Sequence, residues 1–190
     1  MIRDQILTIL AVGGLVVVLG AAAPAPDHVR SVAAFDQMAQ VMTSPRCQNC
    51  HTLTDFPRQG DDRHRHTMNV QRGADGMGAP AMRCATCHGR ANYAASGVPG
   101  ADEAWRLAPL SMGWEGLSKS RLCRQLKDPG HNGGRTGADV IGHLKTHLVV
   151  RAWSPGATAH GHGRTPPPID HATFLKAAET WVATGQACPG

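Results

Sequence analysis

The sequence contains few aromatic residues. Phenylalanine, tyrosine and tryptophan make up 4% of its 190 residues, whereas it has 22 glycines and 13 prolines. Aromatic side chains supply much of the buried area of ordinary cores, so this composition offers sparse material for one. The length fits one domain or two very small ones. A core of normal size therefore needs bulk from another source.

The sequence also lacks a block of basic residues. Its formal net charge is +5, and the lysines and arginines are spread along the chain. Without clustered Lys and Arg, the sequence does not predict a nucleic-acid-binding surface, and we expect no nucleic-acid partner.

A long apolar run lies near the N-terminus. Residues 6–23 are 18 apolar or small residues in which only Thr8 is polar. This length falls between the ~7–15 residues of a signal-peptide core and the ~20 residues of a membrane-spanning helix. We expect residues 1–23 to be a cleaved signal peptide, with a retained N-terminal membrane anchor as the alternative. Residues 24–190 would then function outside the cytoplasm, in the periplasm.

Two pentapeptides share the pattern Cys-x-x-Cys-His. They are Cys47-Gln48-Asn49-Cys50-His51 and Cys84-Ala85-Thr86-Cys87-His88. This is the attachment pattern of a c-type haem, in which two thiols add to the porphyrin vinyl groups and the adjacent histidine binds the iron. Cysteines three positions apart lie on one side of a helical turn, from which both can reach the vinyl edge. The sequence therefore predicts two covalent haems c, which would also supply the missing bulk.

Two other kinds of site use Cys-x-x-Cys pairs. The two pairs could bind one tetrahedral zinc ion, or each could be a redox dithiol. Neither site needs a histidine directly after the second cysteine, and both motifs have one. Haem attachment is therefore the preferred interpretation, and the chain without haem is expected to fold poorly.

The haem propionates change the interpretation of the basic residues. Each haem carries two negatively charged propionates, so two haems would reduce the net charge of the holoprotein to a small positive value. Arg58, Arg63, Arg65 and Arg72 are then predicted to be propionate partners or docking charges.

Helical periodicity recurs in four segments of the chain. They are residues 31–42, 119–127, 138–149 and 171–184. Ser118 and Asp170 are predicted to cap the second and the last of these helices. Long loops follow the two motifs. A helix that leads into a Cys-x-x-Cys-His motif, with a C-terminal helix packed on it, is typical of class I cytochromes c. The predicted fold is mainly α, with class I cytochrome c-like helices and long loops wrapped around two haems.

Each iron needs a sixth ligand, and the long loops contain candidates. These candidates are His64, His66, Met68, Met77 and Met112. His143 and His147 fall one turn apart in the predicted helix of residues 138–149. We interpret them as surface histidines and keep His143 as a reserve ligand.

Two cysteines remain outside the motifs. In an oxidising compartment Cys123 and Cys188 most simply form a disulfide. Closing a loop of about 65 residues would contribute ~3–4 kcal/mol to stability.

The chain resembles a family of small exported dihaem cytochromes, often labelled as a subunit of the molybdenum hydroxylase isoquinoline 1-oxidoreductase. The resemblance covers roughly residues 31–189. It is carried by Pro45-Arg46-Cys47 with Asn49-Cys50-His51, by Gln59-Gly60-Asp61-Asp62, by Asn69-Val70-Gln71-Arg72-Gly73, by Met82-Arg83-Cys84-Ala85-Thr86-Cys87-His88, and by Leu122-Cys123-Arg124-Gln125-Leu126-Lys127-Asp128-Pro129 with Asn132-Gly133-Gly134.

This resemblance implies the redox partners and the sixth ligands. The electron donor would be a periplasmic molybdenum hydroxylase or aldehyde oxidoreductase, and the acceptor a downstream cytochrome or oxidase of the respiratory chain. Family members have a histidine at the position of His66 and a methionine at that of Met112. The resemblance thus implies His66 on the first iron and Met112 on the second. Met68 and His143 are kept as reserves.

Electron transfer without a substrate site is the function expected from the sequence, so the protein is not expected to be an enzyme. A His/Met haem has a higher potential than a His/His haem. The haem at Cys47 and Cys50 would be the low-potential entry, and the haem at Cys84 and Cys87 the exit. The alternative is a dihaem enzyme, peroxidase-like or sulfur- or thiol-oxidising, with one open iron.

Overall fold

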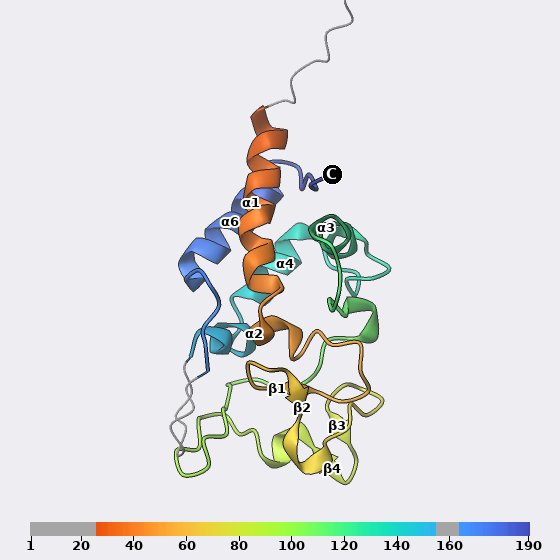
Figure 1. Ribbon diagram of the computed structural model, residues 1–190, viewed down its shortest axis with the longest axis vertical. Coiled ribbons are helices and arrows are strands. Elements are labelled where there is room, and N and C mark those ends of the chain that lie inside the picture. Colours follow the sequence, from red (N-terminus) through yellow and green to blue (C-terminus); the bar gives the residue numbers. More distant parts are fainter. Residues whose placement is uncertain (1–25, 155–163) are drawn as a thin grey trace, which may run out of the picture.

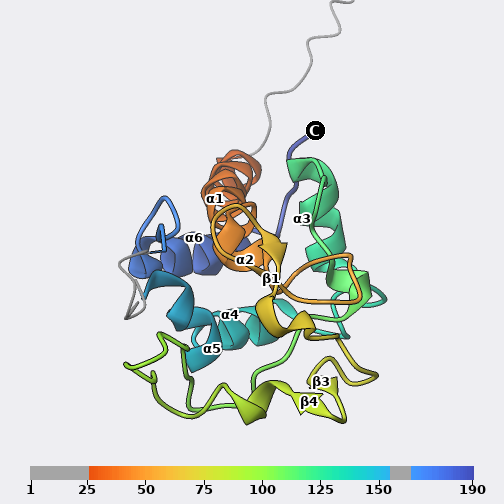
Figure 2. The same ribbon diagram turned by 60° about the horizontal axis from the view of Figure 1, so that its bottom comes forward.

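The computed structural model describes residues 26–154 and 164–190 (Figure 1). The expected signal peptide or anchor at residues 1–23 lies outside these ranges. No helix within them is long and apolar enough to cross a membrane. Helices gather at one end of the molecule, and most of residues 52–109 form loops at the other (Figures 1 and 2).

The mainly α class that the sequence predicts is confirmed. The helical end consists of α1 (Pro26–Met42), α3 (Lys119–Lys127), α4 (Gly137–Leu144) and α6 (His171–Ala183), with the shorter α2 (Pro45–Gln48) and α5 (His147–Val150). Two small antiparallel hairpins pair β1 (Arg58–Gln59) with β2 (His64–Arg65), and β3 (Gly78–Ala79) with β4 (Met82–Arg83). Four 3₁₀ turns complete the described elements: η1 (Thr67–Asn69), η2 (Cys84–Thr86), η3 (Leu110–Met112) and η4 (Arg151–Trp153).

The first and last helices pack against each other. The rings of Phe35 in α1 and Trp181 in α6 are fully buried, and their centroids lie 5.5 Å apart. The hydroxyl of Ser31 accepts a hydrogen bond from the Ala187 N–H at 2.8 Å, which ties the C-terminal tail to α1. This pairing of α1 with α6 is the arrangement that the sequence predicts.

The prediction of one continuous helix over residues 138–149 is wrong, because the structure has two helices there, α4 and α5. Thr146 is extended and precedes the first turn of α5. The N–H of Thr146 bonds to the His143 carbonyl at 3.1 Å, so the ladder of α4 closes before α5 begins. His143 lies in α4 and His147 in α5, so the two histidines do not share one helical face. The apolar periodicity continues across the break, which is why the sequence predicts a single helix.

Local capping explains where α3 and α6 begin. The Ser118 hydroxyl accepts the Arg121 N–H at 3.3 Å at the start of α3. Asp170 accepts the Thr173 N–H at 2.8 Å at the start of α6. Both side chains satisfy backbone donors that have no partner inside the helix. These are the two caps that the sequence predicts.

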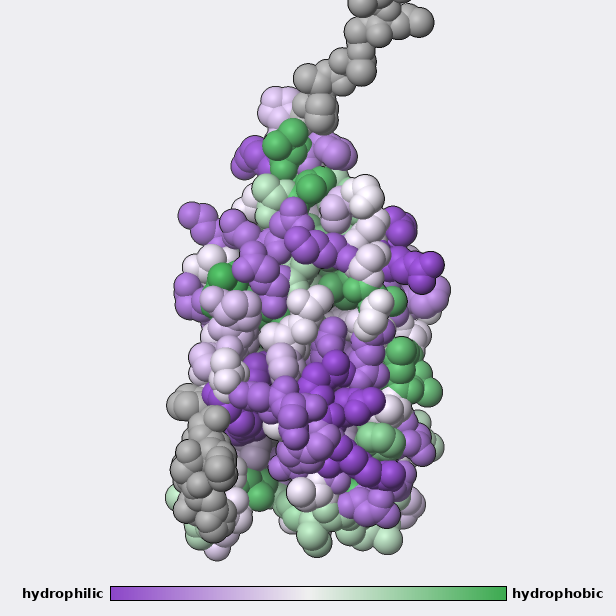
Figure 3. Space-filling view, in the orientation of Figure 1, coloured by the Kyte–Doolittle hydropathy of each residue, from purple (hydrophilic) through white to green (hydrophobic). Residues whose placement is uncertain are grey.

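Buried apolar side chains are concentrated in the helical end. The main cluster draws on residues 34–42, 112–126, 140–144 and 174–181. Between residues 52 and 109, only Ala101 and Leu107 are buried apolar side chains. On the face seen in Figure 3, hydrophilic side chains dominate the middle, and hydrophobic ones lie in smaller groups around it. The loop end is thus nearly without a polypeptide core of its own.

The two cysteines outside the motifs form a disulfide in the structure. Cys123 in α3 and Cys188 after α6 have Cα atoms 5.6 Å apart, and Cys123 is completely buried. The bond links α3 covalently to the segment that follows α6, and both belong to the helical end.

Removing this disulfide is expected to destabilise the protein. The Cys123→Ala/Cys188→Ala variant should lose ~3–4 kcal/mol of unfolding free energy, because its unfolded chain gains loop entropy. Denaturant unfolding followed by far-ultraviolet circular dichroism measures the difference. The single change Lys127→Ala, at an exposed position of the same helix, is the control. An unchanged denaturation midpoint in the double variant would contradict the prediction.

Candidate functional site

The two Cys-x-x-Cys-His motifs have the same backbone geometry. In each, the histidine N–H donates to the carbonyl of the first cysteine, at 3.0 Å from His51 to Cys47 and at 2.9 Å from His88 to Cys84. The second cysteine donates to the same carbonyl at 3.2 Å in both motifs. Each motif is therefore a single helical turn, which places its two thiols on one side and carries the chain into the histidine.

The two motif histidines are also oriented in the same way. His51 Nδ1 lies 2.9 Å from the Met112 carbonyl, and His88 Nδ1 lies 2.8 Å from the Pro99 carbonyl. A carbonyl only accepts hydrogen bonds, so Nδ1 carries the proton and the lone pair of Nε2 is left for another partner. Metal-binding histidines are commonly oriented by this bond.

A tryptophan stacks on each of these imidazoles. Trp114 lies against His51 with centroids 3.4 Å apart and a 10° angle between the rings, and Trp105 lies against His88 at 4.1 Å and 22°. Both indole Nε1 atoms are buried and lack a hydrogen-bond partner within the described chain. Such donors fit an acceptor from outside the polypeptide, for example a haem propionate. Sequence reasoning assigned these tryptophans no role, although two of the chain's four tryptophans lie in residues 89–116, the loop directly after the second motif.

The motif cysteines are unpaired, and burial raises the pKa values of three of them. Burial, helped by the neighbouring Cys50, raises the pKa of Cys47 to about 12. Burial also raises the pKa values of Cys50 and Cys84. Reactive Cys-x-x-Cys dithiols have lowered pKa values, so these thiols do not resemble a redox dithiol of that type.

The motif histidines are neutral near pH 7. Burial lowers the pKa of His51 to about 3, against the opposing effect of its bond to the Met112 carbonyl. Burial also lowers the pKa of His88. Neutral imidazole is the form that binds metal ions.

Each motif thus has the groups by which a protein holds a c-type haem. It offers two thiols on one side of a turn and an oriented imidazole beside them. In the described ranges, no three His, Cys, Asp or Glu side chains gather into a cluster that could hold a bare metal ion. The residues present at both motifs fit a haem, since the porphyrin itself supplies four ligands to its iron.

The arginines expected to bind propionates have other partners in the structure. Arg58 Nε lies 2.6 Å from a carboxylate oxygen of Glu115, and Arg63 pairs with the same carboxylate. The Arg65 guanidinium lies 4.2 Å from the centroid of the Phe56 ring. These three side chains organise the loop after the first motif.

Arg72 also bonds within the chain. Its guanidinium donates to the carbonyls of Thr52 at 2.9 Å, Thr54 at 3.0 Å and Ala108. The side chain therefore connects the loop after the first motif with the loop after the second. Burial lowers the pKa of Arg72.

Two arginines that were not selected from the sequence also lie near the motifs. Burial lowers the pKa of Arg46, which directly precedes Cys47, and of Arg164, with Arg46 adding to the effect on Arg164. Among the described residues, Asp61 is the carboxylate that acts on both arginines. Crowded, half-buried cations of this kind suit an additional carboxylate such as a propionate.

The predicted sixth ligands lie at motifs different from those expected. The ring of His66, assigned from sequence to the first iron, lies 6.0 Å from the ring of His88 in the second motif. Met112, assigned to the second iron, has its carbonyl bonded to His51 in the first motif and its side chain 6% exposed in the helical core. Met68 is 73% exposed.

The reserve ligand His143 is half-buried on α4. Its proximity contributes to the lowered pKa of His51, after burial as the main cause. His143 therefore lies in the neighbourhood of the first motif.

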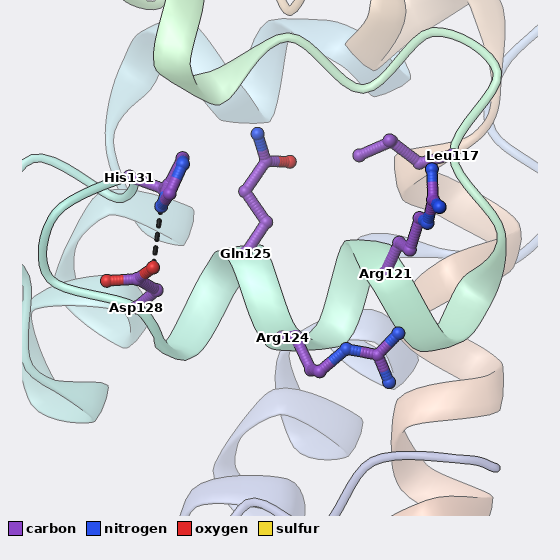
Figure 4. Close-up of a pocket in the computed structure, with 6 residues that line it drawn as sticks. All are labelled: Leu117, Arg121, Arg124, Gln125, Asp128 and His131. Atoms are coloured by element: carbon purple, nitrogen blue, oxygen red, sulfur yellow. Dashed lines mark hydrogen bonds and ion pairs between the residues drawn. The ribbon is translucent and has the colours of Figure 1, made fainter.

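A separate polar hollow of about 260 Å³ lies along α3 (Figure 4). Its lining residues are Leu117, Arg121, Arg124, Gln125, Asp128 and His131. Figure 4 shows the pairing of His131 with Asp128, whose atoms lie 2.6 Å apart. The hollow contains no residue of either Cys-x-x-Cys-His motif.

Comparison of the chain with models of protein families, with curated proteins and with solved structures finds no match.

Proposed function

We propose that the protein is an exported dihaem c-type cytochrome that transfers electrons. One haem would be attached to Cys47 and Cys50, and the other to Cys84 and Cys87. The observation that supports this best is the repetition of one local arrangement. Both motifs combine a helical turn, a histidine whose Nδ1 faces a backbone carbonyl, and a tryptophan stacked on that histidine.

The protein side chains would set the redox properties of the site. A bound haem supplies one-electron chemistry by cycling between Fe(III) and Fe(II). His51 and His88 are oriented to bind through Nε2, and their Nδ1 bonds increase the basicity of the imidazoles. Trp114 and Trp105 hold these rings in position and exclude water from one side of them.

Backbone hydrogen bonds support transfer between two redox centres, because they hold the motifs in one body. The segment after the second motif returns to the first, where the Ala108 N–H donates to the Cys50 carbonyl at 3.3 Å. The adjacent Leu107 N–H donates to the Gly76 carbonyl at 2.8 Å in the loop before the second motif. The Cys84 thiol also contributes to the raised pKa of Cys50, after burial as the main cause.

The proposed setting follows from the N-terminal run and the family resemblance. The chain would act in the periplasm, either free after signal cleavage or anchored through residues 6–23. Its electron donor would be a molybdenum hydroxylase or aldehyde oxidoreductase, and its acceptor a respiratory cytochrome or oxidase. In this role the chain is an electron carrier without a substrate site.

A dihaem enzyme with one open iron is the second candidate, and one observation favours it. Among the described residues, Trp114 is the aromatic ring found beside His51, whereas His88 also has the imidazole of His66 nearby. In this second function the reserve ligand His143 would stay unbound near the first motif, and the first iron would lack a protein sixth ligand. Ready binding of carbon monoxide to the reduced protein would favour the enzyme over the carrier.

Mass spectrometry tests the proposal directly. The purified exported protein is expected to carry two haem additions, and its colour should stay with the polypeptide in acidified organic solvent. The Cys84→Ser/Cys87→Ser variant should carry one addition, whereas Cys123→Ala/Cys188→Ala should keep both. Fewer than two additions on the unmodified chain, or colour that passes into the solvent, would overturn the proposed function.

A further inference from the structure

We infer that His66 and His88 are the two axial ligands of one iron, that of the haem attached at Cys84 and Cys87. This inference rests on the proposed function and assigns a ligand pair within it. It moves His66 from the first iron, where the sequence places it, to the second. It also removes Met112 from the second iron.

The distance between the two rings is the first argument. A metal-bound imidazole has its ring centre roughly 3 Å from the metal, about 2 Å of bond plus about 1 Å of ring. Two imidazoles on opposite sides of one iron therefore have centres about 6 Å apart. The centroids of His66 and His88 are 6.0 Å apart, with 71° between the ring planes. Axial imidazoles can adopt any such angle, because each can rotate about its bond to the metal.

The hydrogen bonds of the two rings are the second argument. His66 Nδ1 lies 2.7 Å from the Thr67 carbonyl, and His88 Nδ1 lies 2.8 Å from the Pro99 carbonyl. Both rings therefore use Nδ1 as a donor and keep the lone pair of Nε2 available. His66 shares this feature with both motif histidines, which are the predicted iron ligands.

The loop before the second motif holds His66 in place. The His66 N–H bonds to the Pro57 carbonyl at 3.0 Å, next to the β1–β2 hairpin. The following N–H, of Thr67, bonds to the Gln59 side chain at 2.9 Å. Met68 then adopts a φ of 64°, a left-handed conformation that is uncommon for a side chain of this kind. A left-handed turn thus follows directly after the residue that bears the ring.

Two other candidates in the same loop, His64 and Met68, are less suitable. His64 is exposed, and its Nδ1 lies 2.6 Å from Asp62. Met68 is 73% exposed. His66 is half-buried and is the member of this group whose ring is paired with a motif histidine.

The competing explanation is an aromatic contact without a shared metal. Edge-to-face ring pairs have centroids roughly 4.5–7 Å apart, so the distance alone is compatible with both. The two explanations differ in the result of removing His66. A shared iron loses a ligand, whereas a ring contact leaves the iron unchanged.

The test uses the full dihaem holoprotein with His66→Ala. One of the two low-spin irons is expected to become high-spin in the electron paramagnetic resonance spectrum, and the reduced variant should bind one additional equivalent of carbon monoxide. The control is His64→Ala, two residues earlier in the same hairpin, which should leave both irons unchanged. His66→Met should instead keep the iron low-spin and raise one of the two potentials.

Proton magnetic resonance of the reduced unmodified protein assigns the iron without any variant. The His66 ring protons should show dipolar contacts to the porphyrin joined to Cys84 and Cys87. Contacts to the other porphyrin, or unchanged spin states in His66→Ala, would overturn the inference while leaving the dihaem function intact. Absence of two covalent haems would overturn the proposed function itself, and this pair with it.

Discussion

A chain without its four motif cysteines is expected to keep its helical end folded and to lose the order of residues 52–109. The variant replaces Cys47, Cys50, Cys84 and Cys87 with alanine, so no haem can be attached. Amide hydrogen exchange should become at least roughly 100-fold faster in residues 52–109, the factor that corresponds to about 3 kcal/mol of local stability. Amides of α1 and α6 should remain protected.

The uneven distribution of buried side chains is the reason for this expectation. Residues 52–109 bury only Ala101 and Leu107 as apolar side chains. Their backbone hydrogen bonds, such as that from Tyr93 to Val98 at 2.9 Å, each contribute about 1 kcal/mol net. Such bonds do not offset the ordering of a long loop, since fixing each residue costs roughly 1–2 kcal/mol. The helical end has its own core and the Cys123–Cys188 disulfide.

Hydrogen exchange with mass spectrometry compares this variant with the holoprotein. The amides of α1 and α6 serve as the internal control, since both helices belong to the same molecule. Equal loss of protection at both ends would mean that the helical end also depends on haem. Retained protection in residues 52–109 would mean that the loops are stable without it.

Replacing Met112 with alanine is expected to destabilise the protein without altering either iron. The side chain is 6% exposed and belongs to the core of the helical end. Removal of a buried methionine side chain typically costs ~2–5 kcal/mol. The hydrogen bond from His51 goes to the backbone carbonyl of Met112, which the substitution keeps. Denaturant unfolding and a potentiometric titration measure the two quantities.

Met68→Ala is the matched control for this variant. Met68 is 73% exposed, so its replacement should change the unfolding free energy by less than about 0.5 kcal/mol. If Met112→Ala lowers the higher of the two potentials and abolishes a methionine–iron absorption band, Met112 is a ligand as the sequence predicts. If the iron affected is that of the haem at Cys84 and Cys87, the result would also overturn the assignment of His66 and His88 to that iron.

Local features of the fold could be predicted from the sequence because short-range interactions determine them. The boundaries of α3 were predicted as Lys119–Lys127, and the caps Ser118 and Asp170 were identified, since a cap bonds to an amide only three residues away. The division between α4 and α5 could not be predicted. The apolar periodicity is the same on both sides of the extended Thr146.

The sequence by itself determined the chemical groups of the site: two thiol pairs, each followed directly by an imidazole, and two further cysteines to pair. Only the tertiary structure decided which groups meet them. It placed the Met112 carbonyl and Trp114 on His51, and brought His66 to His88. These partners lie far away along the chain. These contacts form because long-range hydrogen bonds, such as those of Arg72, fold the loops back on each other. Local sequence patterns do not predict contacts of this kind.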